Sequence, residues 1–176
     1  MKNIEVEIQT VVAGKDWPRL KKFFDRNAKF LGEHKDRTAY FEKNGRIRIR
    51  MEPAWAYFVF KSGKMHDRAR KEIEIKFSKK DARLAEKFLN SLGFPVQIRW
   101  ERVRRKYLWN GVTVTLDDTR GYGKLLELEK MSAAGGQERT FKLLVKRLKF
   151  LRVKPTSREN LNRKFRNYIK NWRKFF

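Results

Sequence analysis

The sequence predicts an α+β domain in which seven or eight antiparallel strands are interspersed with helices. Apolar and polar residues alternate strictly along several short segments, the pattern of strands with one buried face. Asn44-Gly45 and Asn110-Gly111 are strong hairpin turns between such segments. Capping and stop residues delimit the helical segments. With 176 residues and 40% hydrophobic content, the chain is large enough for one domain with a substantial core.

The first half of the chain predicts one helix among five strands. Residues 4–11 alternate as a strand. Asp16 as N-cap and Pro18 in the first turn then begin a helix that we expect to reach Leu31, with Gly32 closing it. The other strands of this half are expected at residues 40–41, 46–52, 55–61 and 70–77.

The second half predicts three further strands and three helices. Ser78 and Asp81 have the spacing of a capping box for a helix that Gly93 and Pro95 end. Thr156 and Glu159 have the same spacing before a last helix. The strands are expected at 97–108, 112–117 and 125–130, and an amphipathic helix at 139–151. We assign residues 1–151 to the main domain and 152–176 to a C-terminal helix that belongs or is appended to it.

The net charge of +25 predicts attraction to polyanions such as nucleotides, polyphosphate, nucleic acid or an anionic membrane surface. The charge is uneven: from Arg139 onward, fourteen Lys and Arg accompany one acid, Glu159. The chain has no cysteine, which excludes disulfides and thiolate metal sites and fits a reducing cytoplasm. We see no signal peptide and no apolar run of membrane-spanning length, so we expect a cytoplasmic protein.

Three Glu-x-Glu pairs lie on the alternating strands of this basic chain. They are Glu5/Glu7, Glu72/Glu74 and Glu127/Glu129. Because alternate side chains of a strand share a face, each pair places two carboxylates about 6.6 to 7 Å apart. A bound Mg²⁺ or Mn²⁺ would relieve their repulsion, since hard cations take oxygen ligands. For one pair alone, a solvated strand face is the simpler explanation.

Basic side chains follow the same alternation on other strands. Arg46, Arg48 and Arg50 share one face, as do Arg102 and Arg104, and Lys61 shares its face with Val59. If helices covered the apolar strand faces from outside, the charged faces would line a tunnel in which carboxylates hold a cation and arginines grip phosphate oxygens. Periodicity alone does not choose between this tunnel and a sheet with a solvated face.

Several motifs, in order along residues 4–130, resemble those of the CYTH domains, also called triphosphate tunnel metalloenzymes. The opening E-x-E corresponds to Glu5-Val6-Glu7, and R-x-E-x-E to residues 70–74. Tyr40-Phe41 with residues 47–50 is similar to the family's "YF…LRIR", and Phe60-Lys61-Ser62-Gly63 to its Y-K-G turn. Residues 102–107, Leu116-Asp117, 121–123 and 127–129 resemble the remaining motifs.

The resemblance implies an eight-stranded antiparallel tunnel with flanking helices, followed here by a basic C-terminal helix. It implies metal ligands at Glu5, Glu7, Asp117, Glu127 and Glu129, with Glu72 and Glu74 supporting a metal or the basic groups. It implies substrate contacts from Arg48, Arg50, Lys61, Arg70, Arg102, Arg104 and Gln9. Glu5, Glu7, Lys61 and Arg104 are the catalytic candidates, and the cofactor is Mg²⁺ or Mn²⁺.

The implied reaction is metal-dependent chemistry on a triphosphate: ATP, tripolyphosphate or thiamine triphosphate. Water as nucleophile would give hydrolysis, and the ribose 3′-hydroxyl of ATP would give cyclic AMP with pyrophosphate, the class IV adenylyl cyclase reaction. Two positions depart from the family pattern. Gln9 replaces a lysine, and Thr38 stands where an acid is common, although Asp36 lies nearby.

A non-catalytic module that binds nucleic acid or another polyanion is the alternative. The C-terminal segment favours it, because Leu161, Phe165, Ile169 and Trp172 recur at helical spacing with basic residues between them. Such a helix either packs its aromatic stripe on the domain or presents a basic amphipathic surface to nucleic acid or an anionic membrane. His34 and His66 are expected in solvated loops. The sequence leaves the oligomeric state open.

Overall fold

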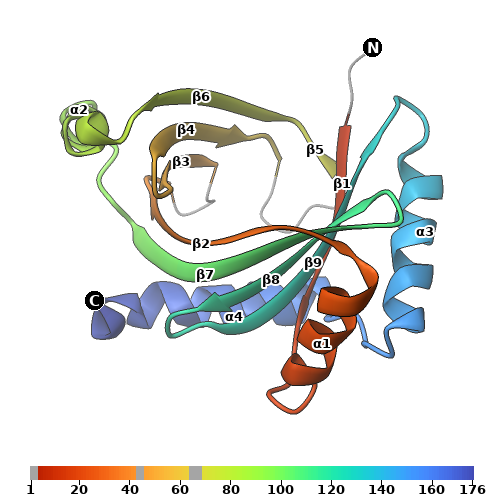
Figure 1. Ribbon diagram of the computed structural model, residues 1–176. Helices are drawn as coiled ribbons and strands as arrows, with labels where there is room; N and C mark the ends of the chain where they lie inside the picture. The colour runs from red at the N-terminus through yellow and green to blue at the C-terminus, as the bar shows by residue number, and fades with distance from the viewer. Residues whose placement is uncertain (1–3, 43–45, 64–68) are drawn as a thin grey trace.

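In the computed structural model of Figure 1, the described residues form a strongly curled antiparallel sheet with four α-helices around it. The structure describes residues 4–42, 46–63 and 69–176. Nine strands form one sheet in the order β5-β1-β9-β8-β7-β2-β3-β4-β6, and every pair is antiparallel. This confirms the predicted α+β fold class.

Most strands follow the alternating segments of the sequence, but β2 does not, because only its last residue, Tyr40, falls in the strand predicted at 40–41. Their bounds are β1 Ile4–Val11, β2 Lys29–Tyr40, β3 Ile47–Met51, β4 Trp55–Lys61, β5 Ala69–Arg70, β6 Glu72–Ser78, β7 Ile98–Trp109, β8 Val112–Thr119 and β9 Gly123–Ser132. The helices are α1 Trp17–Asn27, α2 Ala82–Ser91, α3 Gln137–Phe150 and α4 Arg158–Asn171, with short 3₁₀ turns η1 Lys79–Asp81 and η2 Trp172–Phe175.

The two outermost strands of the sheet are consecutive in the chain, and this closes the tunnel. β6 pairs with β4 at one edge, while β5 pairs with β1 at the other, and only Lys71 separates β5 from β6. The single predicted strand at 70–77 is thus divided at Lys71, which gives nine segments in place of eight. Because one piece of chain pairs with both ends of the sheet, the sheet curls around an interior.

The first helix is shorter, and the strand after it longer, than the sequence analysis predicted. α1 ends at Asn27 instead of Leu31, because Ala28 is already extended and the following residues pair with β7. Phe30 therefore lies in β2, where its ring contacts Tyr107. Gly32 does not close the helix; it adjoins a register shift in β2 at a φ of +138°, a conformation that favours glycine.

The predicted turns and caps hold in part. Asn110 and Gly111 both have positive φ, as a two-residue hairpin between β7 and β8 requires. Asn44-Gly45 lies outside the described residues. Ser78 caps the short turn η1 by accepting from the Lys80 amide, whereas α2 has Asp81 as its N-cap without a side-chain bond, and Asp16 makes no side-chain cap bond either. The N-cap of α4 is Ser157, one residue beyond Thr156, whose hydroxyl instead meets that of Thr10 in β1.

The largest apolar core lies outside the tunnel, between the sheet and helices α1 and α3. Leu20 and Phe24 of α1 and Leu144 and Leu148 of α3 are buried against outward-facing residues of β1, β7, β8 and β9. Those residues are Val6, Ile8, Tyr107, Trp109, Val112, Val114, Leu116, Leu126 and Leu128. Because the apolar strand faces are covered from outside, the alternate side chains of the same strands point inward.

The C-terminal helix closes one end of the tunnel. Phe165, Tyr168 and Trp172 pack against Trp100 and Leu125. These two residues share strand faces with the inward-pointing Arg102 and Glu127. The Tyr168 hydroxyl donates to the carbonyl of Arg99 at 2.9 Å. The aromatic stripe of this segment therefore packs on the domain. Its apolar side chains are buried there and do not form an exposed face for binding a membrane surface.

The outer face of β4 and β6 is covered less completely than we predicted from the tunnel hypothesis. α2 packs Ala85 and Leu89 near Phe58 and Phe77. Ile73 and Ile75 of β6, however, are 59% and 60% exposed. The helices thus cover the β1, β7, β8 and β9 side of the tunnel and leave part of the β6 side open. No helix in the described parts of the chain is long and apolar enough to cross a membrane.

Gly121 offers a test of how α4 and η2 dock. A methyl group at Gly121 would overlap the ring of Phe175, whereas one at Gly135 would meet nothing within 4 Å. Both glycines have positive φ, +71° and +83°, so the backbone strain of an alanine is similar. We expect Gly121→Ala to lower the free energy of unfolding by about 1 to 3 kcal/mol more than Gly135→Ala, measured by urea denaturation. Equal losses would contradict this packing.

Candidate active site

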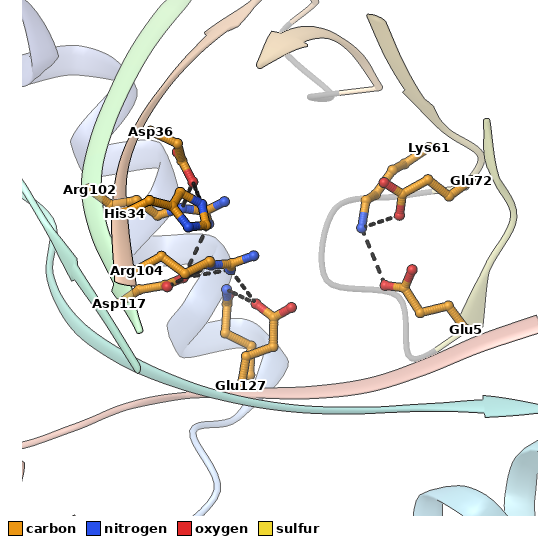
Figure 2. Close-up of polar contacts among 10 residues, drawn as sticks. Glu5, His34, Asp36, Lys61, Glu72, Arg102, Arg104, Asp117 and Glu127 are labelled. Atoms are coloured by element: carbon orange, nitrogen blue, oxygen red, sulfur yellow. Dashed lines mark hydrogen bonds and ion pairs between the residues drawn. The ribbon is translucent and has the colours of Figure 1, made fainter. Parts of the chain in front are cut away.

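The interior of the tunnel is lined by charged side chains from nearly every strand, in two groups facing each other. Figure 2 shows Asp36, Arg102, Arg104 and Asp117 on one wall and Lys61 with Glu5 and Glu72 on the other, while Glu127 reaches toward Arg104. Gln9, Arg48 and Arg50 line the same cavity, as does Glu7. The charged strand faces therefore point inward, as the tunnel hypothesis predicted.

Asp117 of β8 holds Arg102 and Arg104, which form the arginine wall of the tunnel. It is fully buried and accepts from Nε and Nη2 of Arg104, at 2.7 Å each, and from Nη1 of Arg102 at 3.1 Å. Asp36 of β2 holds Arg102 from the other side at 2.8 Å. Although burial opposes ionisation, Arg104 and Arg102 hold the pKa of Asp117 below its ordinary value. This wall thus presents two fixed guanidinium groups at neutral pH.

Lys61 of β4 joins three strands across the opposite wall. Its ammonium lies 2.6 Å from Glu72 of β6 and 3.3 Å from Glu5 of β1. Burial would lower the lysine pKa, but Glu7, Glu5 and Glu72 outweigh it and raise the pKa. Burial opposes the charge on Glu72 as well, yet Lys61 lowers that pKa to about 2. Lys61 is therefore a buried, persistently charged group beside the closing strand.

Two arginines of β3 complete the basic lining. Arg50 contacts Glu74 at 2.7 Å and Glu52 at 3.1 Å. The Arg48 guanidinium lies over the ring of Tyr40, 4.8 Å from its centre. Together with Lys61, these contacts show that Glu72 and Glu74 sit beside the basic groups of β4 and β3. Of the two supporting roles predicted for that pair, holding the basic groups fits the contacts better.

The paired strands β1 and β9 carry four glutamates, Glu5 and Glu7 on β1 and Glu127 and Glu129 on β9, which together form the carboxylate floor of the tunnel. Glu7 is directly opposite Glu129, and Gln9 is opposite Glu127, to which its amide donates at 3.4 Å. Burial raises the pKa of Glu5 to about 9, despite Lys61, and the charges of Glu129 and Glu7 add to the rise. Burial and the charge of Glu7 likewise raise the pKa of Glu127. Glu5 and Glu127 therefore resist ionisation, because burial and neighbouring carboxylates both oppose their negative charge.

The donor set of this floor fits a divalent cation of the Mg²⁺ type. Directly opposed carboxylates are unfavourable unless a cation lies between or near them. Among the described residues, no cluster of three or more Asp, Glu or His side chains is positioned to hold a metal ion. A Mg²⁺ ion here would take one or two carboxylates and complete its coordination with water and substrate phosphates. Glu7 and Glu129 are the best placed to hold it.

Several residues of the cavity were missed or misplaced by the sequence analysis. His34 lies in β2, not in a loop, with its Nε2 3.9 Å from Asp36. Tyr40, Trp100 and Phe165 line the cavity at the end that α4 closes. His66 lies outside the described residues, and so does the side chain of Arg70, although its backbone pairs with Glu5. The two-residue periodicity of β2 could have located His34 had the strand been recognised.

Comparison with known proteins agrees with this geometry. Residues 3–160 match the model of the CYTH domain. The chain belongs to the CYTH family. A Methanocaldococcus jannaschii protein named "putative adenylate cyclase" is 28% identical over 174 residues, which cover 92% of this chain and 95% of that protein. CYTH proteins include triphosphatases and adenylate cyclase-like enzymes, and they bind triphosphate substrates.

Solved structures share the fold of this CYTH chain. A Pyrococcus furiosus conserved hypothetical protein superposes with a TM-score of 0.71 at 25% identity, over 85% of this chain and 91% of that one. A Hippeastrum protein described as a "putative adenylyl cyclase" with a dominant triphosphatase activity has a TM-score of 0.64 at 18% identity. That match covers 94% of this chain and 96% of the other, and at this identity it shows the fold alone.

Asp117 provides a stability test of the arginine wall. Asp117→Asn removes the carboxylate that compensates two buried guanidinium groups, so we expect a loss of about 3 to 5 kcal/mol in unfolding free energy. The matched control is Asp118→Asn, because Asp118 is the next residue, is 51% exposed and pairs with Lys124. It should cost less than about 1 kcal/mol. Urea denaturation in phosphate-free buffer measures both, and similar losses would contradict the assignment.

Proposed function

We propose that this CYTH protein hydrolyses a phosphoanhydride bond of a triphosphate-bearing small molecule inside the tunnel, with Mg²⁺ or Mn²⁺ as cofactor. The observation that carries the proposal is the division of the tunnel into a carboxylate floor on β1 and β9 and basic groups on β3, β4 and β7. A metal–triphosphate complex is the kind of ligand that needs both, because it carries a cation and several phosphate oxygens.

The basic residues support phosphate binding because they are held in place before a ligand arrives. Arg102 and Arg104 share Asp117, and Arg50 and Lys61 each contact glutamates. Guanidinium groups match phosphate oxygens bidentately, and fixed donors lose little entropy when they bind. In this proposal Arg48, Arg50, Arg102 and Arg104 bind the phosphates, and Lys61 and Arg104 face the charge that develops in the transition state.

The acidic residues divide between metal binding and proton transfer. Glu7 and Glu129 are the proposed ligands of the cation, which when bound would neutralise charge on the phosphate oxygens, while Glu127 lies beside them in contact with Gln9. Glu5 stands 3.3 Å from Lys61, and in its ionised form this carboxylate is the proposed acceptor of the proton from the attacking water. Asp117, which is held by two arginines, positions those arginines instead of a metal.

The experiment that tests the proposal is ³¹P NMR of the protein mixed with tripolyphosphate, ATP or thiamine triphosphate, with and without Mg²⁺ or Mn²⁺. Metal-dependent loss of a terminal phosphate from any of them supports hydrolysis. Cyclic AMP with pyrophosphate would establish the class IV adenylyl cyclase reaction instead, which the name of the Methanocaldococcus jannaschii relative favours. No turnover of the three substrates with either metal would overturn the proposal and favour a non-catalytic polyanion-binding module.

Glu129 is the sharpest single test of the metal role. Glu129→Gln keeps the shape of the side chain but removes one charge from the opposed pair with Glu7. We expect metal-dependent turnover to fall by about 100-fold or more, because charge stabilisation at the reacting phosphate is lost. Glu33→Gln is the control, because Glu33 is 42% exposed and pairs with Arg105 away from the lumen. Full activity of the Glu129 variant with either metal would exclude it as a required ligand.

A substitution at Gln9, which stands where the family has a lysine, tests whether the missing positive charge limits substrate affinity. The Gln9 amide contacts Glu127, so a lysine there would add a positive charge beside the floor. We expect Gln9→Lys to lower the KM for tripolyphosphate several-fold through this added attraction, measured by phosphate release. Gln9→Met, which has a similar length without the charge, should not improve KM. If both variants behave alike, the charge at position 9 does not limit substrate binding.

A further inference from the structure

The outward face of α4 and η2 carries a stripe of cations. Arg163, Arg166, Lys170 and Arg173 follow one another at steps of three or four residues, so they lie along one side of the helix, and all are exposed, as is Lys174. From Arg163 to Arg173 the stripe is about 15 Å long, at the rise of an α-helix. Figure 1 shows this segment running beside the sheet to the C-terminus.

In the described structure, no acidic side chain pairs with these cations. Some basic groups elsewhere do have carboxylate partners, as in Arg105 with Glu33 and Lys124 with Asp118. Within the described residues, none of the ion pairs includes Arg163, Arg166, Lys170, Arg173 or Lys174. Glu159 is the one acid between residues 139 and 176. The stripe therefore keeps its full positive potential toward solvent.

We propose that this stripe is a nucleic-acid binding surface that contacts the phosphate backbone without reading sequence, separately from the tunnel. Closely spaced cations along one face of a helix match the regular charges of a nucleic-acid strand, and their counterions are released when it binds. The proposal goes beyond the proposed triphosphatase function and does not depend on it, because none of the five cations lines the tunnel cavity.

A shallow groove beside the stripe supports nucleic acid over an unstructured polyanion. It is lined by Lys164, Asn167, Asn171 and Lys174, together with Tyr122 and Phe175. The two amides add neutral donors and acceptors to the basic groups, which is the mixture of side chains that contacts phosphate and sugar oxygens in nucleic-acid complexes. The cation stripe and a groove that contains two lysines and two amides thus both lie on the C-terminal segment.

The burial of the apolar side of α4 argues against a membrane as the partner. A helix that binds a bilayer surface inserts its own apolar face among the lipids. In α4 and η2 that face is occupied, because Leu161, Phe165, Tyr168 and Trp172 are buried against the domain. What remains outside is polar and positively charged, which suits a hydrated polymer of phosphates.

The test is fluorescence anisotropy of the full chain with labelled 20-nucleotide single-stranded RNA and a 20-base-pair DNA duplex across a range of salt concentrations. The quadruple variant Arg163→Gln, Arg166→Gln, Lys170→Gln, Arg173→Gln should bind at least tenfold more weakly near 100 mM salt. For this variant, the slope of log K against log salt concentration should be smaller in magnitude by about 3. Each of the four lost phosphate contacts contributes about 0.7 to 0.9 to that slope. Thermal unfolding verifies that the variant is folded.

The control variant removes the same charge elsewhere: Lys15→Gln, Lys80→Gln, Arg83→Gln, Lys87→Gln, all at exposed positions outside α4. It should retain binding to within about twofold, and saturating tripolyphosphate with Mg²⁺ should not displace the nucleic acid. Equal weakening in both variants would show that net charge alone binds nucleic acid. Complete displacement by tripolyphosphate would place the contact in the tunnel. Either result, or binding only to anionic lipid vesicles, overturns the proposal.

Discussion

Closure of the sheet with its charged faces inward is the constraint on which the rest of the structure depends. A buried charge is costly unless another charge compensates it. Accordingly, Asp117 is shared by Arg102 and Arg104, while Lys61 lies between Glu5 and Glu72. The second of these contacts links β1, β4 and β6 around the point where the sheet closes. The same pairs that make an inward charged face tolerable also hold the phosphate-binding groups in position.

Buried charges are neutralised on one side of the tunnel but not on the other, and this difference determines which ligand the tunnel suits. Arginines and aspartates balance one another on the β7 and β8 side. On the β1 and β9 side, Glu7 faces Glu129, and burial leaves Glu5 and Glu127 with raised pKa values. A divalent cation together with the triphosphate would neutralise the floor and engage the arginines. We therefore regard the metal–triphosphate complex, and not the bare phosphate, as the proposed ligand.

The strands and the sidedness of the charges could be predicted from sequence, because a period of two is a local property of the chain. The closing of the tunnel could not, since the break at Lys71 is visible only when β5 and β6 are seen to pair at opposite edges. The early end of α1 was missed because Lys29 to Leu31 continue an amphipathic pattern, and their pairing with β7 decides their structure. The pairing of each acidic side chain with a basic one depends on the register between neighbouring strands, and so does the position of His34. Neither could be predicted from a single segment of sequence.

The most direct test of the central claim is whether metal and triphosphate bind together at the carboxylate floor. The ³¹P relaxation rates of a non-hydrolysable imido analogue of tripolyphosphate would be measured with Mn²⁺ and protein. The account predicts strong paramagnetic enhancement that requires the protein and is largely lost in Glu7→Gln, Glu129→Gln, whose pair forms the floor. Enhancement that persists unchanged in this double variant would place the metal elsewhere and contradict the account.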